Sequence, residues 1–206
     1  MPQRDTPPRS TLRQNIAALA ARLISEEGIN DYALAKRKAA RQLGITEGEA
    51  MPNNAEIEAE LRAYQALYRD EEDDERLAMM RETAVEVMRE LSPWRPALTG
   101  AVLDGTATGF SEVEIDVFAD SVKDVEIFLL NAGIDYEHRE IRRPGPESPE
   151  AVLSFDWDEV PVKLCVFDLV GERTPRRNGA ERARLAAVEA LCEQQEASAR
   201  DEGPAR

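Results

Sequence analysis

The spacing of apolar residues divides this chain into two parts. Before Pro93 they recur every three to four positions, which is typical of amphipathic helices. Asn53 with Glu56 forms a capping box, and Gly28 and Pro93 end the first and the last of these helices. The four predicted helices run roughly over residues 11–27, 31–43, 53–68 and 71–91.

After Pro96 the pattern changes to short apolar runs separated by turns. Residues 113–118 alternate cleanly between apolar and polar positions, as a strand with one buried face does. Ser121 then caps a helix that ends near Gly133. The other predicted elements are a strand over 98–103 with Gly100 inside it, a strand over 135–142, a hairpin of 151–156 and 160–167, and a helix over 179–195.

Together these elements predict an α+β fold. A flexible arm over residues 1–10 precedes a helical region over 11–92, an α/β domain follows over 95–195, and a flexible tail covers 196–206. Because helices with one apolar face need a surface to cover it, we expect the N-terminal helical segment to pack on a small mixed β-sheet.

Composition and charge exclude several classes of protein. With 42% hydrophobic residues among 206, the chain has enough apolar side chains for a core and is not expected to be disordered as a whole. Its formal net charge of −15 argues against general nucleic-acid binding, because phosphate contacts need a basic surface. The densest basic group, Lys36, Arg37, Lys38 and Arg41, fits a solvated helix face better than an RNA or phosphate contact.

Few residues suit metal or nucleophilic chemistry. Cys165 and Cys192 lie far apart without a CxxC partner, so we interpret them as small apolar residues. The single histidine, His138, argues against a histidine-based metal centre and a Ser-His-Asp triad. No segment approaches the roughly 20 apolar residues of a membrane helix, and residues 1–10 lack an apolar signal core. We therefore expect a cytoplasmic protein without a membrane partner.

Two carboxylates lie side by side on the alternating strand. Glu114 and Asp116 are two positions apart, so their side chains point the same way and their Cα atoms lie about 7 Å apart. Such a pair can share divalent cations, and Mg²⁺ prefers carboxylate oxygens together with water and phosphate. Gly100 and the small residues of the 104–111 loop would let a phosphate approach the backbone without a Cβ in the way.

The run Leu98-Thr99-Gly100-Ala101, the loop of small residues and Glu114-Ile115-Asp116 together resemble the nucleotidyltransferase superfamily that includes DNA polymerase beta. The family pattern is a hydrophobic residue, Gly, then Gly or Ser, a spacer, and two acidic residues flanking a hydrophobic one, with a third carboxylate on a later strand. The resemblance covers about residues 95–170. It implies that Glu114 and Asp116 are catalytic and hold Mg²⁺, and that a nucleotide binds at Gly100, Ala101, Gly105 and Thr106.

This sequence departs from the family pattern at three positions. Ala101 lacks the hydroxyl that often contacts a phosphate, and Glu114 is longer than the usual Asp. Lys163 stands where the third carboxylate is expected; its ammonium would satisfy the acidic pair and repel a metal ion, and we count it among the nucleotide-binding residues. The hypothesis is therefore a nucleotidyltransferase-like protein with a degenerate metal site, unless Asp156 or Asp158 supplies the third ligand.

Other interpretations stay open. A Glu-Ile-Asp alternation is also what a half-exposed antiparallel strand shows, and the pair would then have no chemical role. An active metal-dependent nucleotidyltransferase that uses Glu114 and Asp116 is one alternative function. A non-catalytic module that binds a partner protein through the N-terminal helices is another. Lys163 separates the first two functions, because an ammonium that faces the acidic pair indicates a pseudoenzyme.

Overall fold

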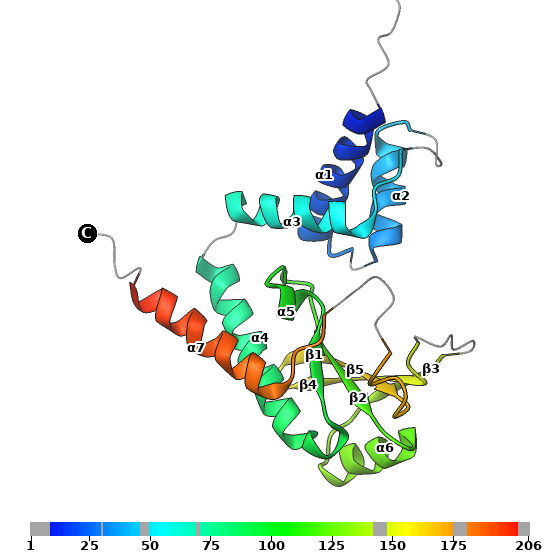
Figure 1. Ribbon diagram of the computed structural model, residues 1–206, viewed down its shortest axis with the longest axis vertical. Coiled ribbons are helices and arrows are strands. Elements are labelled where there is room, and N and C mark those ends of the chain that lie inside the picture. Colours follow the sequence, from blue (N-terminus) through cyan, green and yellow to red (C-terminus); the bar gives the residue numbers. More distant parts are fainter. Residues whose placement is uncertain are drawn as a thin grey trace, which may run out of the picture. The chain divides into compact units, whose positions relative to one another are not determined.

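The computed structural model describes residues 9–29, 31–45, 50–68, 71–141, 148–174 and 181–201 (Figure 1). The chain divides into two compact units: the first extends to Asp73 and includes Thr108–Phe110, and the second consists of Asp74–Ala107 and the residues from Ser111 onward. The described residues form helices and one five-stranded mixed sheet, so the α+β class with an N-terminal helical region is confirmed. Most of the predicted arm lies outside the described residues.

The first unit contains three helices, α1 (Arg9–Glu27), α2 (Tyr32–Gln42) and α3 (Asn54–Tyr68). The predicted capping box is confirmed, because Asn53 Oδ1 accepts from the Glu56 amide at 2.8 Å and Glu56 Oε2 accepts from the Asn53 amide at 2.7 Å. Glu56 Oε2 also forms an ion pair with Arg13 Nη2 of α1 at 2.7 Å, which links α3 to α1. The core of this unit is built of alanine, leucine and isoleucine side chains on the facing sides of the helices: Ile16, Ala20, Leu23, Ala35, Ala39, Ile57 and Leu61.

The fourth helix, α4 (Glu71–Glu90), packs against the sheet in the second unit. Its buried side chains, Leu77, Met80, Ala84, Val87 and Met88, belong to the same core cluster as the strands. The helical region predicted over 11–92 is therefore divided between the two units.

The strands are β1 (Ala97–Thr99), β2 (Val113–Phe118), β3 (Glu137–Glu140), β4 (Ala151–Trp157) and β5 (Val160–Phe167). Their order in the sheet is β1-β2-β5-β4-β3, with β2 and β5 parallel and the other pairs antiparallel. The hairpin of β4 and β5 turns at Asp158 and Glu159, as predicted from its sequence.

One face of the sheet is covered by α4, by α6 (Val122–Asn131) and by α7 (Leu185–Asp201). Figure 1 shows α4 and α7 side by side, and the Arg81 side chain of α4 donates to Gln195 of α7 at 2.8 Å. The central residues of this core are Leu98, Ile115, Val125, Leu153, Leu164 and Val188. None of the helices in the described part of the chain is both long and apolar enough to cross a membrane.

Two predicted elements differ in the structure. The strand predicted over 98–103 ends at Thr99, because Gly100 has φ 73° and ψ −157° and cannot continue a strand; a one-turn helix, α5 (Ala101–Asp104), follows it. The last helix begins at Leu185, not near 179, and continues to Asp201, into the residues predicted as a tail.

Candidate functional site

The face of the sheet opposite the core carries the predicted site residues. Directly paired residues place their side chains on the same face, so the register assembles rows of side chains across the five strands. The first row is Thr99, Glu114, Lys163, Ser154 and Glu137. The second row is Ala97, Asp116, Cys165, Val152 and Arg139. The structure thus brings Glu114, Asp116 and Lys163 together on one face of the sheet.

Gly100 lies beside Glu114 at the end of β1. A Cβ at Gly100 would come within 3.4 Å of the Glu114 carboxylate, and the Gly100 carbonyl accepts from the Asp104 amide at 3.0 Å to close the turn of α5. The side-chain hydroxyl of Thr99, which is fully buried, has no hydrogen-bond partner among the described residues. An unsatisfied buried hydroxyl costs about 1–3 kcal/mol, so the first row has unused hydrogen-bonding capacity next to Glu114.

Lys163 faces the acidic pair. Its Nζ lies 3.0 Å from Glu114 Oε1, and both side chains are about a quarter exposed. Burial alone would lower the pKa of the Lys163 ammonium, but the negative charge of Glu114, helped by Cys165 and Glu112, raises that pKa above its ordinary value. Because the pKa of Lys163 is raised on folding, its charge stabilises the fold fully at neutral pH, and this contribution is lost as pH rises through the raised value.

Asp116 is paired with a residue that sequence reasoning missed. Its side chain has 0% exposure and accepts from Arg182 Nε at 2.8 Å. The Nη1 of Arg182 donates to the carbonyls of Gly171 and Thr174, each at 3.0 Å. The guanidinium also lies over the rings of Phe118 and Phe167, 5.0 and 5.2 Å from their centroids. The carboxylate of Asp116 is therefore paired with the guanidinium of Arg182, which is held in turn by two backbone carbonyls and two aromatic rings.

The arrangement does not fit a divalent metal. No group of three or more His, Cys, Asp or Glu side chains that could hold a metal ion exists among the residues that the structure describes. The alternative third ligand, Asp156, lies on β4, two strands away from Glu114, and pairs there with Pro161 of β5. That register separates the two Cα atoms by about 12 Å, whereas Mg²⁺ binds oxygens at about 2.1 Å. Asp158 lies in the turn beyond β4, farther still.

The remaining predicted nucleotide contacts do not form a phosphate loop on this face. Gly105 ends α5 with φ 74°, and the Thr106 amide donates to the Ala101 carbonyl at 2.9 Å. The Thr106 side chain is buried, so its hydroxyl is not presented at the surface. The small residues after α5 thus have a structural role in closing the turn.

Other candidate residues are held by neighbours. Lys36 donates to the Pro52 carbonyl and to Asn54, and Lys38 pairs with Glu27, so much of the basic group on α2 is engaged within its own unit. His138 lies on the exposed strand β3, where its Nδ1 is 2.7 Å from Glu126 Oε1.

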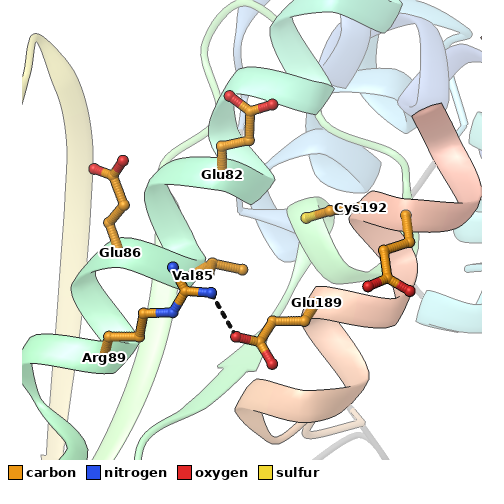
Figure 2. A pocket seen from close by; sticks show the side chains of 7 residues that line it. Glu82, Val85, Glu86, Arg89, Glu189 and Cys192 are labelled. Carbon is orange, nitrogen blue, oxygen red and sulfur yellow. Dashed lines mark hydrogen bonds and ion pairs between the residues drawn. The ribbon is translucent and has the colours of Figure 1, made fainter.

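A separate pocket of about 500 Å³ lies between α4 and α7 (Figure 2). Figure 2 shows Arg89 extending from α4 toward Glu189 of α7, to which it is bonded at 2.7 Å. The complete lining is Glu82, Val85, Glu86, Arg89, Glu189, Cys192 and Glu193. Its four carboxylates and one guanidinium give it an excess of negative charge.

We predict that Cys192 is a poor nucleophile. Burial raises the pKa of its thiol, and Glu82 and Glu196 add to this effect against the opposing charge of Arg81. Since the thiolate is the reactive form, its alkylation by iodoacetamide at pH 8 should be slower than that of a cysteine in an unstructured peptide. Mass spectrometry after timed labelling checks this, with Cys192→Ala identifying the labelled residue. Labelling as fast as that of the peptide would contradict the expected shift.

Arg182 could not be found from sequence pattern. It lies 66 positions after Asp116, outside any predicted strand, and nothing in its spacing distinguishes it from its neighbours. The sequence pattern also gave no sign that Arg95, Glu172 and Arg184 form ion pairs near the start of β1. These contacts depend on how the segment after β5 passes back over the sheet.

Comparison with known proteins gives no further indication: no family model matches the chain, and no curated protein and no solved structure matches it.

Proposed function

We propose that this chain is a nucleotidyltransferase-like protein that has exchanged its metal site for two internal ion pairs, and that it binds nucleotide without metal-dependent transfer. The observation that carries the proposal is the pairing of both carboxylates with cations, Glu114 with Lys163 at 3.0 Å and Asp116 with Arg182 at 2.8 Å. The resemblance of 98–116 to the family supports the nucleotide as ligand.

Electrostatics supports the loss of transfer. A divalent ion needs carboxylate oxygens that are free to coordinate it, but each of these carboxylates already has a cation within hydrogen-bond distance. Replacing Arg182 by a metal ion would also remove the guanidinium from the two carbonyls and two aromatic rings that hold it. The ammonium and the guanidinium therefore supply the positive charge that metal ions supply in an active enzyme.

Two features beside Glu114 favour retained binding of a nucleotide. Gly100 keeps the backbone beside Glu114 free of a Cβ, so a ligand can approach the backbone there. The row also contains Lys163, whose side chain is partly exposed and carries a full positive charge at neutral pH.

We expect nucleoside triphosphates to raise the melting temperature of the protein equally with and without Mg²⁺ or Mn²⁺. Thermal-shift titration with all four nucleotides tests this, because only ligands of the folded state stabilise it. A rise that requires metal would overturn the proposal in favour of the active enzyme. No rise with any nucleotide would also overturn it and favour the module that binds a partner protein through the N-terminal helices.

Lys163→Asp tests the role assigned to the ammonium. The change removes the positive charge and restores a carboxylate at the position expected for the third metal ligand, so Mn²⁺ affinity should rise by about tenfold or more. Lys163→Met is the matched control, because it removes the charge without adding a ligand. Mn²⁺ titration followed by electron paramagnetic resonance measures both. If Lys163→Asp binds Mn²⁺ no better than Lys163→Met, the ammonium does not replace a metal.

A further inference from the structure

A second pocket, of about 360 Å³, lies at the far end of β2 from Gly100 and Glu114. Arg184, which lines it, is 5.4 Å above the ring of Phe118, four positions along the strand from Glu114. Four strand positions span about 13 Å, so this pocket is distant from Glu114, although Arg182, the partner of Asp116, also lies over the ring of Phe118. It is lined by Met88, Ser92, Arg95, Pro96, Glu172, Arg184, Leu185 and Ala186.

Two guanidiniums converge on one carboxylate in this pocket. Arg95 Nη1 lies 2.6 Å from Glu172 Oε2, and Arg184 Nη2 lies 2.6 Å from Glu172 Oε1. The side chain of Glu172 is 19% exposed, whereas those of Arg95 and Arg184 are about half exposed. The cluster therefore has one more positive than negative charge and leaves part of each guanidinium accessible.

The backbone around Arg95 holds the guanidinium of Arg184 in place. Arg95 has the left-handed conformation, φ 49° and ψ 57°, which is uncommon for a residue with a side chain and is found where the surrounding structure enforces it. Its carbonyl accepts from Arg184 Nη1, as does the Pro96 carbonyl at 3.3 Å. With Nη1 held by the backbone and its plane over Phe118, Arg184 presents Nη2 to an oxyanion in a fixed orientation.

Other groups in the pocket also suit a phosphate. Helix α7 begins at Leu185, and its first residues, Leu185 and Ala186, line the pocket. The first amides of a helix have no partner within it, and the positive end of the helix dipole favours an anion there. Met88, Pro96 and Leu185 provide apolar walls for an organic group attached to the anion.

We propose that this pocket binds a phosphate monoester, and that Glu172 occupies the two-arginine clamp until such a ligand displaces it. Two guanidiniums and a helix N-terminus match the charge and the several oxygens of a phosphate better than the single charge of a carboxylate. The pocket between α4 and α7 has the opposite sign of charge, so the preference for an anion belongs to this pocket in particular. This inference is independent of nucleotide binding at Gly100.

Glu172→Ala tests the competition directly. If the carboxylate holds the clamp for most of the time, removing it raises the fraction of protein that is ready to bind, and the affinity for inorganic phosphate and for phenyl phosphate should rise by about tenfold or more. Glu181→Ala is the matched control, because Glu181 is exposed, lies four positions before the start of α7, and its removal changes the net charge equally. Isothermal titration calorimetry at constant ionic strength measures the affinities.

Arg184→Gln and Arg95→Gln, each made in the Glu172→Ala background, should reduce phosphate affinity by at least tenfold, and circular dichroism verifies that each variant is folded. Arg184→Lys should recover only part of the affinity, because an ammonium lacks the planar pair of donors. Equal phosphate binding by Glu172→Ala and Glu181→Ala would overturn the proposal, since charge alone would then explain the gain. So would the absence of phosphate binding to Glu172→Ala, or binding that survives the loss of both arginines.

Discussion

Replacing Arg182 by Met should lower the free energy of unfolding by about 3–5 kcal/mol, the largest effect that we expect from any single substitution in the site. The reason is that Asp116, with 0% side-chain exposure, would be left as a buried carboxylate without the guanidinium that now lies 2.8 Å away. The substitution would also remove the hydrogen bonds to Gly171 and Thr174 that hold the segment after β5. Urea denaturation of the two proteins measures the difference.

The partner substitution separates the charge from the packing. Asp116→Asn should destabilise less than Arg182→Met, because Arg182 keeps its two carbonyl acceptors and lies over two aromatic rings. The double variant should be more stable than the sum of the single effects implies, since neither charge is then buried alone. Arg173→Met, an exposed arginine on the same segment, is the control and should change stability by about 0.5 kcal/mol or less. A loss below about 1 kcal/mol for Arg182→Met would show that Asp116 does not depend on the guanidinium.

Gly100→Ala should cost about 1–3 kcal/mol of stability, although there is room for the added methyl group. Its Cβ would lie 3.4 Å from the Glu114 carboxylate, which is ordinary contact. The cost comes instead from the backbone, because φ 73° with ψ −157° is a combination that only glycine adopts readily. Thermal or urea denaturation measures it, and nucleotide binding should weaken as the turn between β1 and α5 shifts.

Asparagine substitution tests this explanation. Gly133 follows α6 with φ 72°, and the Ile134 amide donates to the Leu129 carbonyl at 2.9 Å, the pattern of a left-handed helix cap that asparagine tolerates. Gly133→Asn should therefore be nearly neutral, whereas Gly100→Asn should be as costly as Gly100→Ala. Equal effects at the two positions would show that ψ at Gly100 is not the source of the strain.

Local sequence patterns predicted most elements of this fold. The capping box at Asn53 and Glu56, the acidic start of α4, the Ser121 cap of α6 and the hairpin turn at Asp158 each involve residues a few positions apart, so the sequence contains both partners. The predicted elements were wrong where contacts between residues far apart in the sequence determine the backbone conformation. The strand at 98–103 was predicted too long because its apolar composition does not reveal the backbone angle that Gly100 adopts next to β2.

The candidate site shows the same division. Because strand side chains alternate, the sequence by itself placed Glu114 and Asp116 on one face of β2, and the hairpin pattern placed Lys163 on a later strand. That Lys163 lies opposite Glu114 was decided by the parallel register of β2 with β5, which a pattern within either strand cannot specify.

The sequence alone determined that this chain has an acidic pair on one face of a strand. Only the tertiary structure decided that Arg182, 66 positions away, buries and neutralises Asp116, and that Arg95, Glu172 and Arg184 meet in one pocket. The physical reason is that local patterns arise from the fixed geometry of helices and strands, whereas these ion pairs depend on where the chain after β5 passes over the sheet. Charged side chains have no periodic signature that reveals such a partner before the fold brings the two together.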